Sequence, residues 1–579
     1  MKIATRNMAW MWDASAVTNE GRSMKLTRRD LLAWSAGAAA GLIVTPVPWK
    51  ILDDTSIWSQ NWPWIPQPAR VPVEINQSHC TLCPKGCGLR VRMAAGWAVG
   101  VAGMKTHPIS RGALCPLGFG AHQLNWHPQR LREVRHHGSS ASWSEAQSTF
   151  AKAKTEGPIV IVDGYPGRAA SSVFESFAEK NHGEYRVVST AETRALASYE
   201  QWTGAPATSL GYDLDNTQTI ISFGAPLLDG WGTPGYLTRL WAEKSAGVDD
   251  PQLRIIQIEP SLSRTAARAW RWVPVREGSE SALASGLARV LLERNLVPAH
   301  GPIPAITISD AAARTGLSED AIQELARTLM SRPPTLAIAA NENPTVAALN
   351  VLLGSVGVRG GVVRKEKTSQ AHRVADGTIA NARAVLIDSS VPWDFAPQTD
   401  AEIFRFAAWN GGPTKADWLL SAPGFLEELT DVPTAPALPV ETYAVAPALV
   451  KTKSEVQSAA QFLVGIDSSL APTEKIIHDR CADLFHKHSG MLHGQDSIAI
   501  AKIESVQKLE KQLWKGAVWV GEPSPPGSLK CELKEWPAEP IPATAAGWAD
   551  SWQAPVLPPL ASKLYIESSL REAPERRNA

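Results

Sequence analysis

Four cysteines carry most of the chemistry that this sequence can perform. Of the six cysteines in 579 residues, three lie within the segment HCTLCPKGCGLR, as Cys80, Cys83 and Cys87, and 27 residues separate Cys87 from a fourth, Cys115. Three closely spaced thiolates and a fourth from a distant loop suit the corners of a cubane [4Fe–4S] cluster. The spacing therefore predicts that these four cysteines bind one such cluster.

Two other uses of the cysteines stay open at this point. A structural zinc site more often shows two separated C-x2-C pairs, and this sequence has one. Disulfides would strain a segment in which the cysteines lie so close together. Neighbouring glycines such as Gly86 and Gly88 let the backbone turn tightly around an inorganic core, which favours the iron–sulfur interpretation.

The N-terminal segment has the pattern of an export signal. Arg28 and Arg29 precede an uncharged run over 31–47, as in the twin-arginine signals that export folded proteins. The run is about 17 residues long, shorter than the ~20 that a membrane-spanning helix needs. We therefore expect delivery to the periplasmic side of the inner membrane, with the signal either cleaved or kept as an anchor.

The rest of the chain alternates buried strands with helices. Residues 158–165, 185–190, 217–224 and 253–260 read as strands separated by helices, and further strands are predicted at 335–342, 384–390 and 417–424. This alternation predicts parallel sheets with helices on both faces. Ligands in such folds lie at the carboxyl ends of the strands, here at 164–167, 224–229, 259–261 and 341–343.

The cysteine motif, HCTLCPKGCGLRVR followed by HPISRGALCPLG, resembles the iron–sulfur domain of the molybdopterin oxidoreductase superfamily. Later segments, including YDLDNTQTIISFGAPLLDGW, extend the resemblance over about 50–570. The segment LDDTSIWSQNWPWIPQPARVP is similar to one branch, the molybdopterin-like subunits of periplasmic menaquinone reductase (Qrc) complexes and of alternative complex III.

The resemblance implies an α/β fold: a small β-rich [4Fe–4S] domain, then two Rossmann-like doubly wound units, with a C-terminal pterin-covering β-barrel truncated or missing. The expected divisions are 1–48 (extension and signal), 49–75 (linker), 76–130 (cluster domain), 131–300 and 301–450 (the two α/β units), and 451–579 (helical segment and tail). Active relatives hold molybdopterin guanine dinucleotide in the strand-end loops. Glu280, in REGSES, stands where an acidic side chain would meet the guanine, although an ordinary βα loop explains that segment equally well.

Three departures from the superfamily argue against an active molybdenum site. Leu117 stands where active relatives place a Lys or Arg after the fourth cysteine. The region 187–206, where the metal ligand is expected, has no cysteine; it contains Ser189 and Ser198, and the latter reads as helical. The covering barrel would begin where this sequence stops. We therefore expect little or no molybdenum and at most a vestigial pterin site.

The remaining signals are weaker. Equal numbers of basic and acidic residues, 57 each, give no reason to expect a nucleic-acid partner. The histidines at 478, 486, 488 and 493, with Cys481, follow no recognisable ligand pattern, and Cys531 reads as a strand residue.

These observations predict an electron-transfer and structural subunit of a membrane-bound quinone reductase complex. The resemblance implies three kinds of partner: a multihaem cytochrome c, a multi-cluster ferredoxin-like subunit and an integral quinone-binding subunit, so membrane contact would come through partners or a retained anchor. Two alternatives remain: an active molybdopterin oxidoreductase of the polysulfide or thiosulfate reductase type, and a scaffold without a redox role.

Overall fold

The computed structural model describes residues 27–44, 51, 72–247, 249–297, 301–365, 373–374, 378–391, 395–410, 416–451 and 455–538. The chain divides into two units, Met1–Val71 and Pro72–Ala579. In the first unit, helix α1 (Arg28–Val44) contains the twin arginine and its apolar run. No helix among the described residues is both long and apolar enough to cross a membrane.

The larger unit begins with a three-stranded antiparallel sheet. Strands β1 (Val73–His79), β2 (Gly88–Ala94) and β3 (Trp97–Gly103) form consecutive hairpins. The predicted turn between β2 and β3 is confirmed at Ala95 and Gly96, whose φ values of 52° and 79° are typical of a tight hairpin turn. Two short helices follow, α3 (Pro116–Gly120) and the 3-10 helix η1 (Ala121–Trp126), and both pack on β3.

The first large sheet has eight strands. Its order is β14-β7-β6-β15-β16-β17-β4-β5, with parallel pairing from β14 to β17 and antiparallel pairing at the β4–β5 edge. The strands are β4 (Val134–His136), β5 (Ser139–Ala141), β6 (Ile159–Asp163), β7 (Glu184–Val187), β14 (Arg373–Val374), β15 (Ala384–Ile387), β16 (Glu402–Ala407) and β17 (Trp418–Ser421).

This sheet is buried on both faces. Along β6, Ile159 and Ile161 pack into one apolar cluster, with side chains from the helices α4 (Trp143–Glu156), α5 (Ala169–Lys180) and α14 (Ala459–Ile466). Val160 and Val162 pack into another on the opposite face. A continuous β-branched run is what a central parallel strand requires, which is why the sequence pattern identified β6.

The second large sheet has four parallel strands in the order β11-β10-β9-β12. They are β9 (Thr219–Phe223), β10 (Arg254–Ile258), β11 (Arg271–Val273) and β12 (Thr335–Ala339). The associated helices are α8 (Pro234–Lys244), α9 (Arg264–Arg268), α10 (Glu280–Glu293), α11 (Ile308–Thr315), α12 (Glu319–Met330) and α13 (Pro344–Leu352). The short antiparallel pair β8 (Leu210–Tyr212) and β13 (Val362–Arg364) accompanies this sheet.

The two α/β units are interleaved in the chain rather than consecutive. The eight-stranded sheet takes strands from 134–187 and again from 373–421, and the four-stranded sheet is built from the residues between them. The expected division at residue 300 therefore falls inside the unit of β9–β12. The cause is long-range pairing: Ala384 of β15 lies in register with Ile159 of β6, which returns the chain to the first sheet.

Residues 430–520 add a five-stranded sheet of order β18-β19-β22-β20-β21, antiparallel throughout. Its strands are β18 (Thr430–Val432), β19 (Thr442–Ala446), β20 (Met491–His493), β21 (Ser497–Ala499) and β22 (Val518–Val520), and the helices α15 (Thr473–Lys487) and α16 (Val506–Trp514) pack nearby. The predicted C-terminal segment thus contains strands as well as helices, and 539–579 lie outside the described residues.

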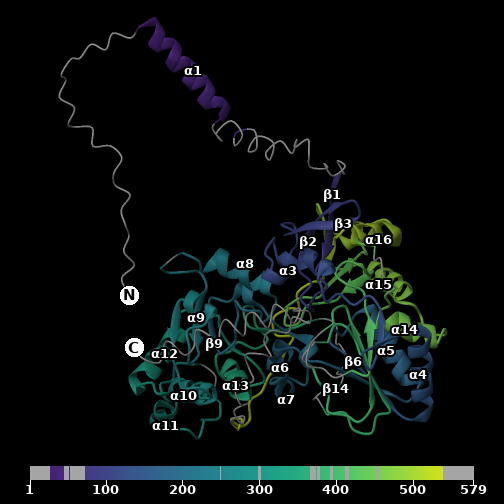
Figure 1. Cartoon of the computed structure of the whole chain (residues 1–579). Helices are drawn as coiled ribbons and strands as arrows, with labels where there is room; N and C mark the ends of the chain where they lie inside the picture. The colour runs from purple at the N-terminus through teal and green to yellow at the C-terminus, as the bar shows by residue number, and fades with distance from the viewer. Residues whose placement is uncertain are drawn as a thin grey trace. The chain divides into compact units, whose positions relative to one another are not determined.

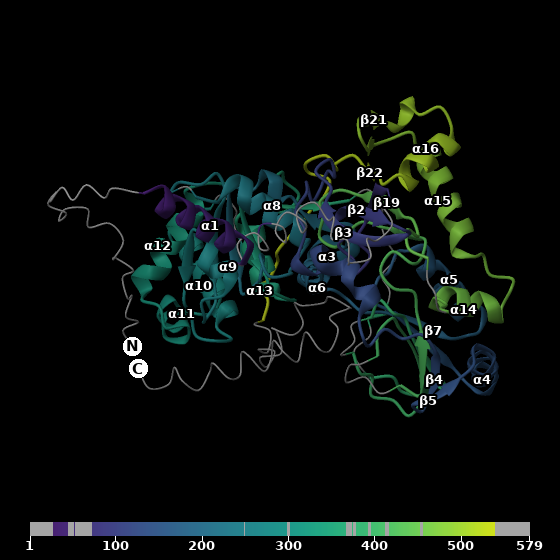
Figure 2. The same ribbon diagram turned by 45° about the horizontal axis from the view of Figure 1, so that its top comes forward.

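Within the larger unit, the cluster domain lies between the two α/β halves. Figures 1 and 2 both show β2, β3 and α3 between the helices of the four-stranded sheet and those of the eight-stranded sheet, with α6 (Ala191–Ala197) beneath α3. The four predicted cluster cysteines therefore belong to a domain that touches both halves of the fold.

Candidate metal centre

The first three cysteines lie in the hairpin loop between β1 and β2. His79 pairs with Gly88 as the last register pair, and the amide of Cys80 donates to the carbonyl of Cys87 at 2.8 Å, which closes the loop. Gly86 turns this loop with φ +60°, a conformation that favours glycine. A β-hairpin thus places Cys80, Cys83 and Cys87 around one short turn.

The fourth cysteine reaches the same place from a helix N-terminus. Cys115 is the N-cap of α3, and its Sγ accepts from the amide of Gly118 at 3.4 Å. A Cβ on Gly118 would lie 3.7 Å from Cys115 Sγ and 3.9 Å from Cys80 Sγ, so those two thiols are neighbours. The structure therefore brings the distant cysteine to the loop, as the cluster prediction requires.

Burial makes this an unfavourable place for uncompensated thiolates. Burial raises the pKa of the Cys83 thiol to about 12, with Cys115 adding to the rise. Burial, together with the other cysteines, also raises the pKa of Cys80 and Cys87. These three buried thiols ionise together only when a cationic core compensates their charge, as bound iron does.

Backbone amides are aimed at the thiols. Besides Gly118, the amides of Leu82, Lys85 and Gly235 donate to Cys80, Cys83 and Cys87 respectively. All six cysteines of the chain are free of disulfides. Hydrogen bonds to the sulfur ligands are among the features that set the reduction potential of an iron–sulfur cluster.

The described residues contain no group of three His, Cys, Asp or Glu side chains close enough to share one metal ion. A zinc ion draws its thiolates to about 2.3 Å each, whereas a cubane spreads them over separate corners. It is the spacing of these four cysteines in the sequence that indicates a multi-iron cluster.

A buried lysine lies in the cysteine loop, and sequence reasoning missed it. Leu117 leaves no cation after the fourth cysteine, but Lys85 Nζ lies 2.5 Å from Glu192 Oε1, with the two side chains 6% and 3% exposed. Glu192 belongs to α6, within the 187–206 region where a metal ligand was sought. The K of CPKGC was visible in the sequence, but its partner lies 107 residues away, and only the fold joins them.

The serines of that region have structural partners. Ser198 is the C-cap of α6, consistent with its helical reading, and its Oγ accepts from the amide of Asn343 at 2.9 Å. The carbonyl of Ser189 accepts from Arg194 at 2.7 Å. Their placement gives no support to a metal–serine bond.

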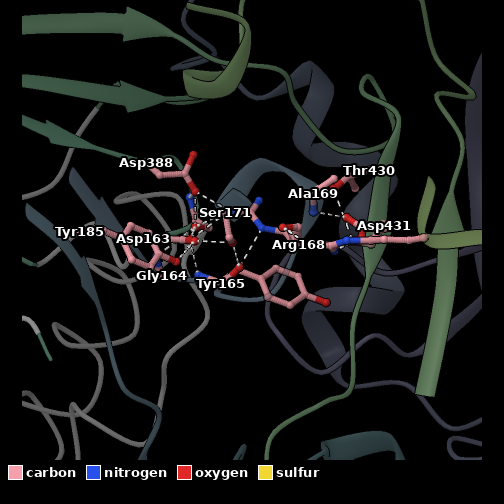
Figure 3. Close-up of polar contacts among 12 residues, drawn as sticks. Asp163, Gly164, Tyr165, Arg168, Ala169, Ser171, Tyr185, Asp388, Thr430 and Asp431 are labelled. Carbon is pink, nitrogen blue, oxygen red and sulfur yellow. Dashed lines mark hydrogen bonds and ion pairs between the residues drawn. The ribbon is translucent and has the colours of Figure 1, made fainter. Parts of the chain in front are cut away.

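The crevice at the carboxyl ends of β6 and β15 is filled by side chains of the chain itself. Arg168 Nη2 lies 3.1 Å from Asp163 Oδ1 and 2.7 Å from Asp388 Oδ2, and Ser390 joins the same group (Figure 3). These strands are neighbours in the sheet where the strand order reverses, the usual ligand position of such folds. The adjoining cavity, lined by Arg168, Asp388 and Glu428, has a volume of about 20 Å³, enough for a water molecule.

The N-terminus of α5 at this crevice is capped internally. Asp431 Oδ1 accepts from the amide of Ala169 at 2.7 Å, and its Oδ2 lies 2.6 Å from Arg480 Nη1. A helix N-terminus at a strand end is a common phosphate site. Here a carboxylate from β18 takes that position.

Glu280 lies at the corresponding edge of the second sheet. It is the first residue of α10, after β11, and burial raises the pKa of its carboxyl group. Its neighbour Ser281 accepts from Asn343 Nδ2 at 2.9 Å, which links this loop to the end of β12. This contact joins the loop after β11 to the predicted loop at 341–343, whereas a role of Glu280 in pterin binding stays a prediction.

The histidine-rich tail shows no shared ligand geometry. His478 Nδ1 lies 2.9 Å from Glu510 Oε1, and His493 Nδ1 lies 2.9 Å from Ser497 Oγ. Cys481 is fully buried in the core between α15 and α16. Cys531 was expected in a strand, but it lies in an irregular segment.

Comparison with known proteins places these observations in a family context. The model of the molybdopterin oxidoreductase Fe4S4 domain matches residues 73–124. The molybdopterin-binding-like subunit of menaquinone reductase from Nitratidesulfovibrio vulgaris is 29% identical over 422 residues, which cover 65% of this chain and 61% of that protein. The molybdopterin-containing subunit of thiosulfate reductase from Salmonella typhimurium is 22% identical over 58% of this chain and 49% of its own length.

A solved structure shares the fold. Acetylene hydratase from Pelobacter acetylenicus superposes with a TM-score of 0.58 at 13% identity, over 77% of this chain and 74% of the other. The chain spans about three fifths of the menaquinone reductase subunit and about half of the thiosulfate reductase subunit. The resemblance to the molybdopterin oxidoreductase superfamily is thereby confirmed, as are a mixed α/β fold and an N-terminal Fe4S4 domain.

Proposed function

We propose that this chain is an electron-transfer and structural subunit of a membrane-bound respiratory quinone reductase complex. It holds one [4Fe–4S] cluster on Cys80, Cys83, Cys87 and Cys115 and has no active molybdenum site. The observation that carries the proposal is the convergence of four free cysteines on one amide-lined loop. The similarity to a menaquinone reductase subunit supports the choice of complex.

The bound cluster supplies one-electron chemistry. The residues of the chain keep the thiols together, exclude water from them and direct backbone amides at the sulfur atoms. The exposed end of the site is at α3 and η1, where Phe119 and Trp126 are 62% and 56% exposed. We place this chain on the periplasmic side of the inner membrane, with a multihaem cytochrome c, a multi-cluster ferredoxin-like subunit and an integral quinone-binding subunit as its partners.

Two features support the absence of an active pterin site. Arg168 is paired with both Asp163 and Asp388 in the crevice at β6 and β15, and Asp431 caps the helix that would otherwise face a phosphate. A dinucleotide would have to displace buried ion pairs, which cost several kcal/mol to break. The rival function, an active molybdopterin oxidoreductase, is suggested by the similarity to thiosulfate reductase.

Metal counting on the complex purified from membranes tests the proposal. We expect about four iron atoms and four sulfides per chain, and molybdenum well below one atom per chain. Cys83→Ala should lose the iron because the site then has three thiolates, Cys80 and Cys87 in the loop and Cys115 at α3. The matched control is Cys531→Ala, which removes a cysteine outside the loop and should keep all four irons. Zinc in place of iron would contradict the cluster, and stoichiometric molybdenum with turnover of thiosulfate or polysulfide would support the rival function.

A further inference from the structure

A buried ion pair joins the cysteine loop to α6, a helix that packs against the four-stranded sheet. Lys85 Nζ contacts Glu192 Oε1 at 2.5 Å, and the amide of Gly232 donates to the same oxygen. Glu192 Oε2 is buried and has no hydrogen-bond partner among the described residues. Three elements therefore meet at one carboxylate, and part of its hydrogen-bonding capacity remains unused.

Stability alone does not account for two charges at this position. Replacing a buried ion pair by well-packed apolar side chains is often neutral or stabilising, because both charges lose their hydration. An apolar pair could hold the loop to α6 equally well. An electrostatic role toward something nearby explains the charges better.

The two charges are placed unequally with respect to the loop. Lys85 lies inside it, between Cys83 and Cys87, and its amide donates to the carbonyl of Cys83 at 2.8 Å. Glu192 approaches from α6 and contacts the loop through the lysine. Because both side chains are at most 6% exposed, little water screens either charge.

We propose that Lys85 and Glu192 are positioning residues that set the midpoint potential of the cluster. Lys85 favours the reduced state, since reduction adds one negative charge beside it, and Glu192 opposes that effect while holding the lysine in place. Net charge around a cluster is one of the factors that fix its potential. This inference rests on the proposed cluster ligation.

The test is a redox titration of the purified complex, with dithionite and ferricyanide, followed by the spin signal of the reduced cluster. Lys85→Gln should shift the midpoint potential to more negative values, and Glu192→Gln should shift it to more positive values. The double variant should lie between them, and Lys85→Arg, which keeps the charge, should stay near the wild type. If the ion pair only held the loop in place, both single variants would loosen the loop and shift the midpoint potential in the same direction. Opposite shifts therefore indicate an electrostatic role.

An exposed ion pair on the same domain provides the matched control. Arg111 Nη1 lies 3.3 Å from Glu243 Oε2, with side chains 51% and 43% exposed. Arg111→Gln should leave the potential nearly unchanged, because water and salt screen that charge.

Iron and sulfide counts show whether the charge-pair inference alone has failed or the proposed cluster ligation with it. Variants that keep four irons but show equal potentials, or shifts of the same sign, would overturn the charge-pair inference and leave the proposed function intact. If Lys85→Gln loses its cluster, the comparison of Glu192→Gln with Lys85→Arg still decides the question. A wild-type complex without iron and sulfide would overturn both proposals.

Discussion

Gly235 shows how closely the second α/β unit approaches the cysteine loop. A Cβ at this position would lie 3.1 Å from Cys87 Sγ and 2.7 Å from the carbonyl oxygen of Ala113. Its own amide also donates to the thiol of Cys87. The second residue of α8 must therefore be small for the loop to keep its shape.

Gly235→Ala should lower both the stability and the iron content of the chain. The added methyl group meets backbone, which cannot move away as a flexible side chain could, and such overpacking costs typically ~1–3 kcal/mol. Iron per chain and the midpoint of thermal unfolding are the measurements. Gly120→Ala is the control, because nothing lies within 4 Å of its Cβ position. If this variant also lost all of its iron, close packing around Gly235 would not explain the loss.

Sequence reasoning found the functional residues whose partners are near in the sequence and missed those whose partners are distant. Cys80, Cys83 and Cys87 share one short segment, so their spacing alone indicates a metal site. The roles of Lys85 and Glu192 depend on a contact across 107 residues, and although Lys85 lies within the cysteine motif, nothing in the sequence indicates its partner. A buried pair of this kind cannot be predicted until the chain is folded.

Individual elements were the most predictable level of the structure. The strand expected at 217–224 contains β9 (Thr219–Phe223), and the strand expected at 335–342 contains β12 (Thr335–Ala339). Apolar runs of this type are buried on both faces, and local periodicity is sufficient to identify them. The residues that cap a helix are harder to identify from the sequence. Helix α5, for example, is capped by Asp431 of β18 rather than by a neighbouring residue.

Asp431→Asn should destabilise the fold by ~2–4 kcal/mol, since it leaves Arg480 without its buried counter-charge and weakens the cap of α5. Asp431 is fully buried, whereas Arg480 keeps its contacts with Gly167, Arg168 and Ser172. Denaturant unfolding measures the change. Asp310→Asn alters an exposed carboxylate that caps α11 and should have a much smaller effect; equal losses in both variants would argue against a special role of the buried cap.

The order of strands across the molecule could not be predicted from periodicity. Each strand was recognisable, but nothing local indicates that β15 pairs with β6 across more than two hundred residues. The cluster domain contacts both interleaved halves: the loop of Cys80–Cys87 meets α6 and α8 beside the four-stranded sheet, and Leu124 accepts a hydrogen bond from Trp409, which follows β16. The cluster domain is thus integrated into the fold rather than attached as a separate module, and we expect its redox properties to depend on distant parts of the chain.

Delivery of the assembled protein is the remaining property of the whole molecule that the sequence predicts. Arg28 and Arg29 open α1 as exposed side chains, and the helix continues through an uncharged run. A buried cluster has to be inserted before or during folding, which suits a pathway that exports folded proteins. Replacing both arginines by lysine keeps the charge but removes the paired guanidinium groups that the export receptor reads, so the protein should accumulate in the cytoplasm with its iron bound. Cell fractionation with iron counting measures where the protein accumulates. A single Lys25→Arg substitution serves as the charge-conserving control. Normal periplasmic delivery of the double-lysine variant would show that export follows another route.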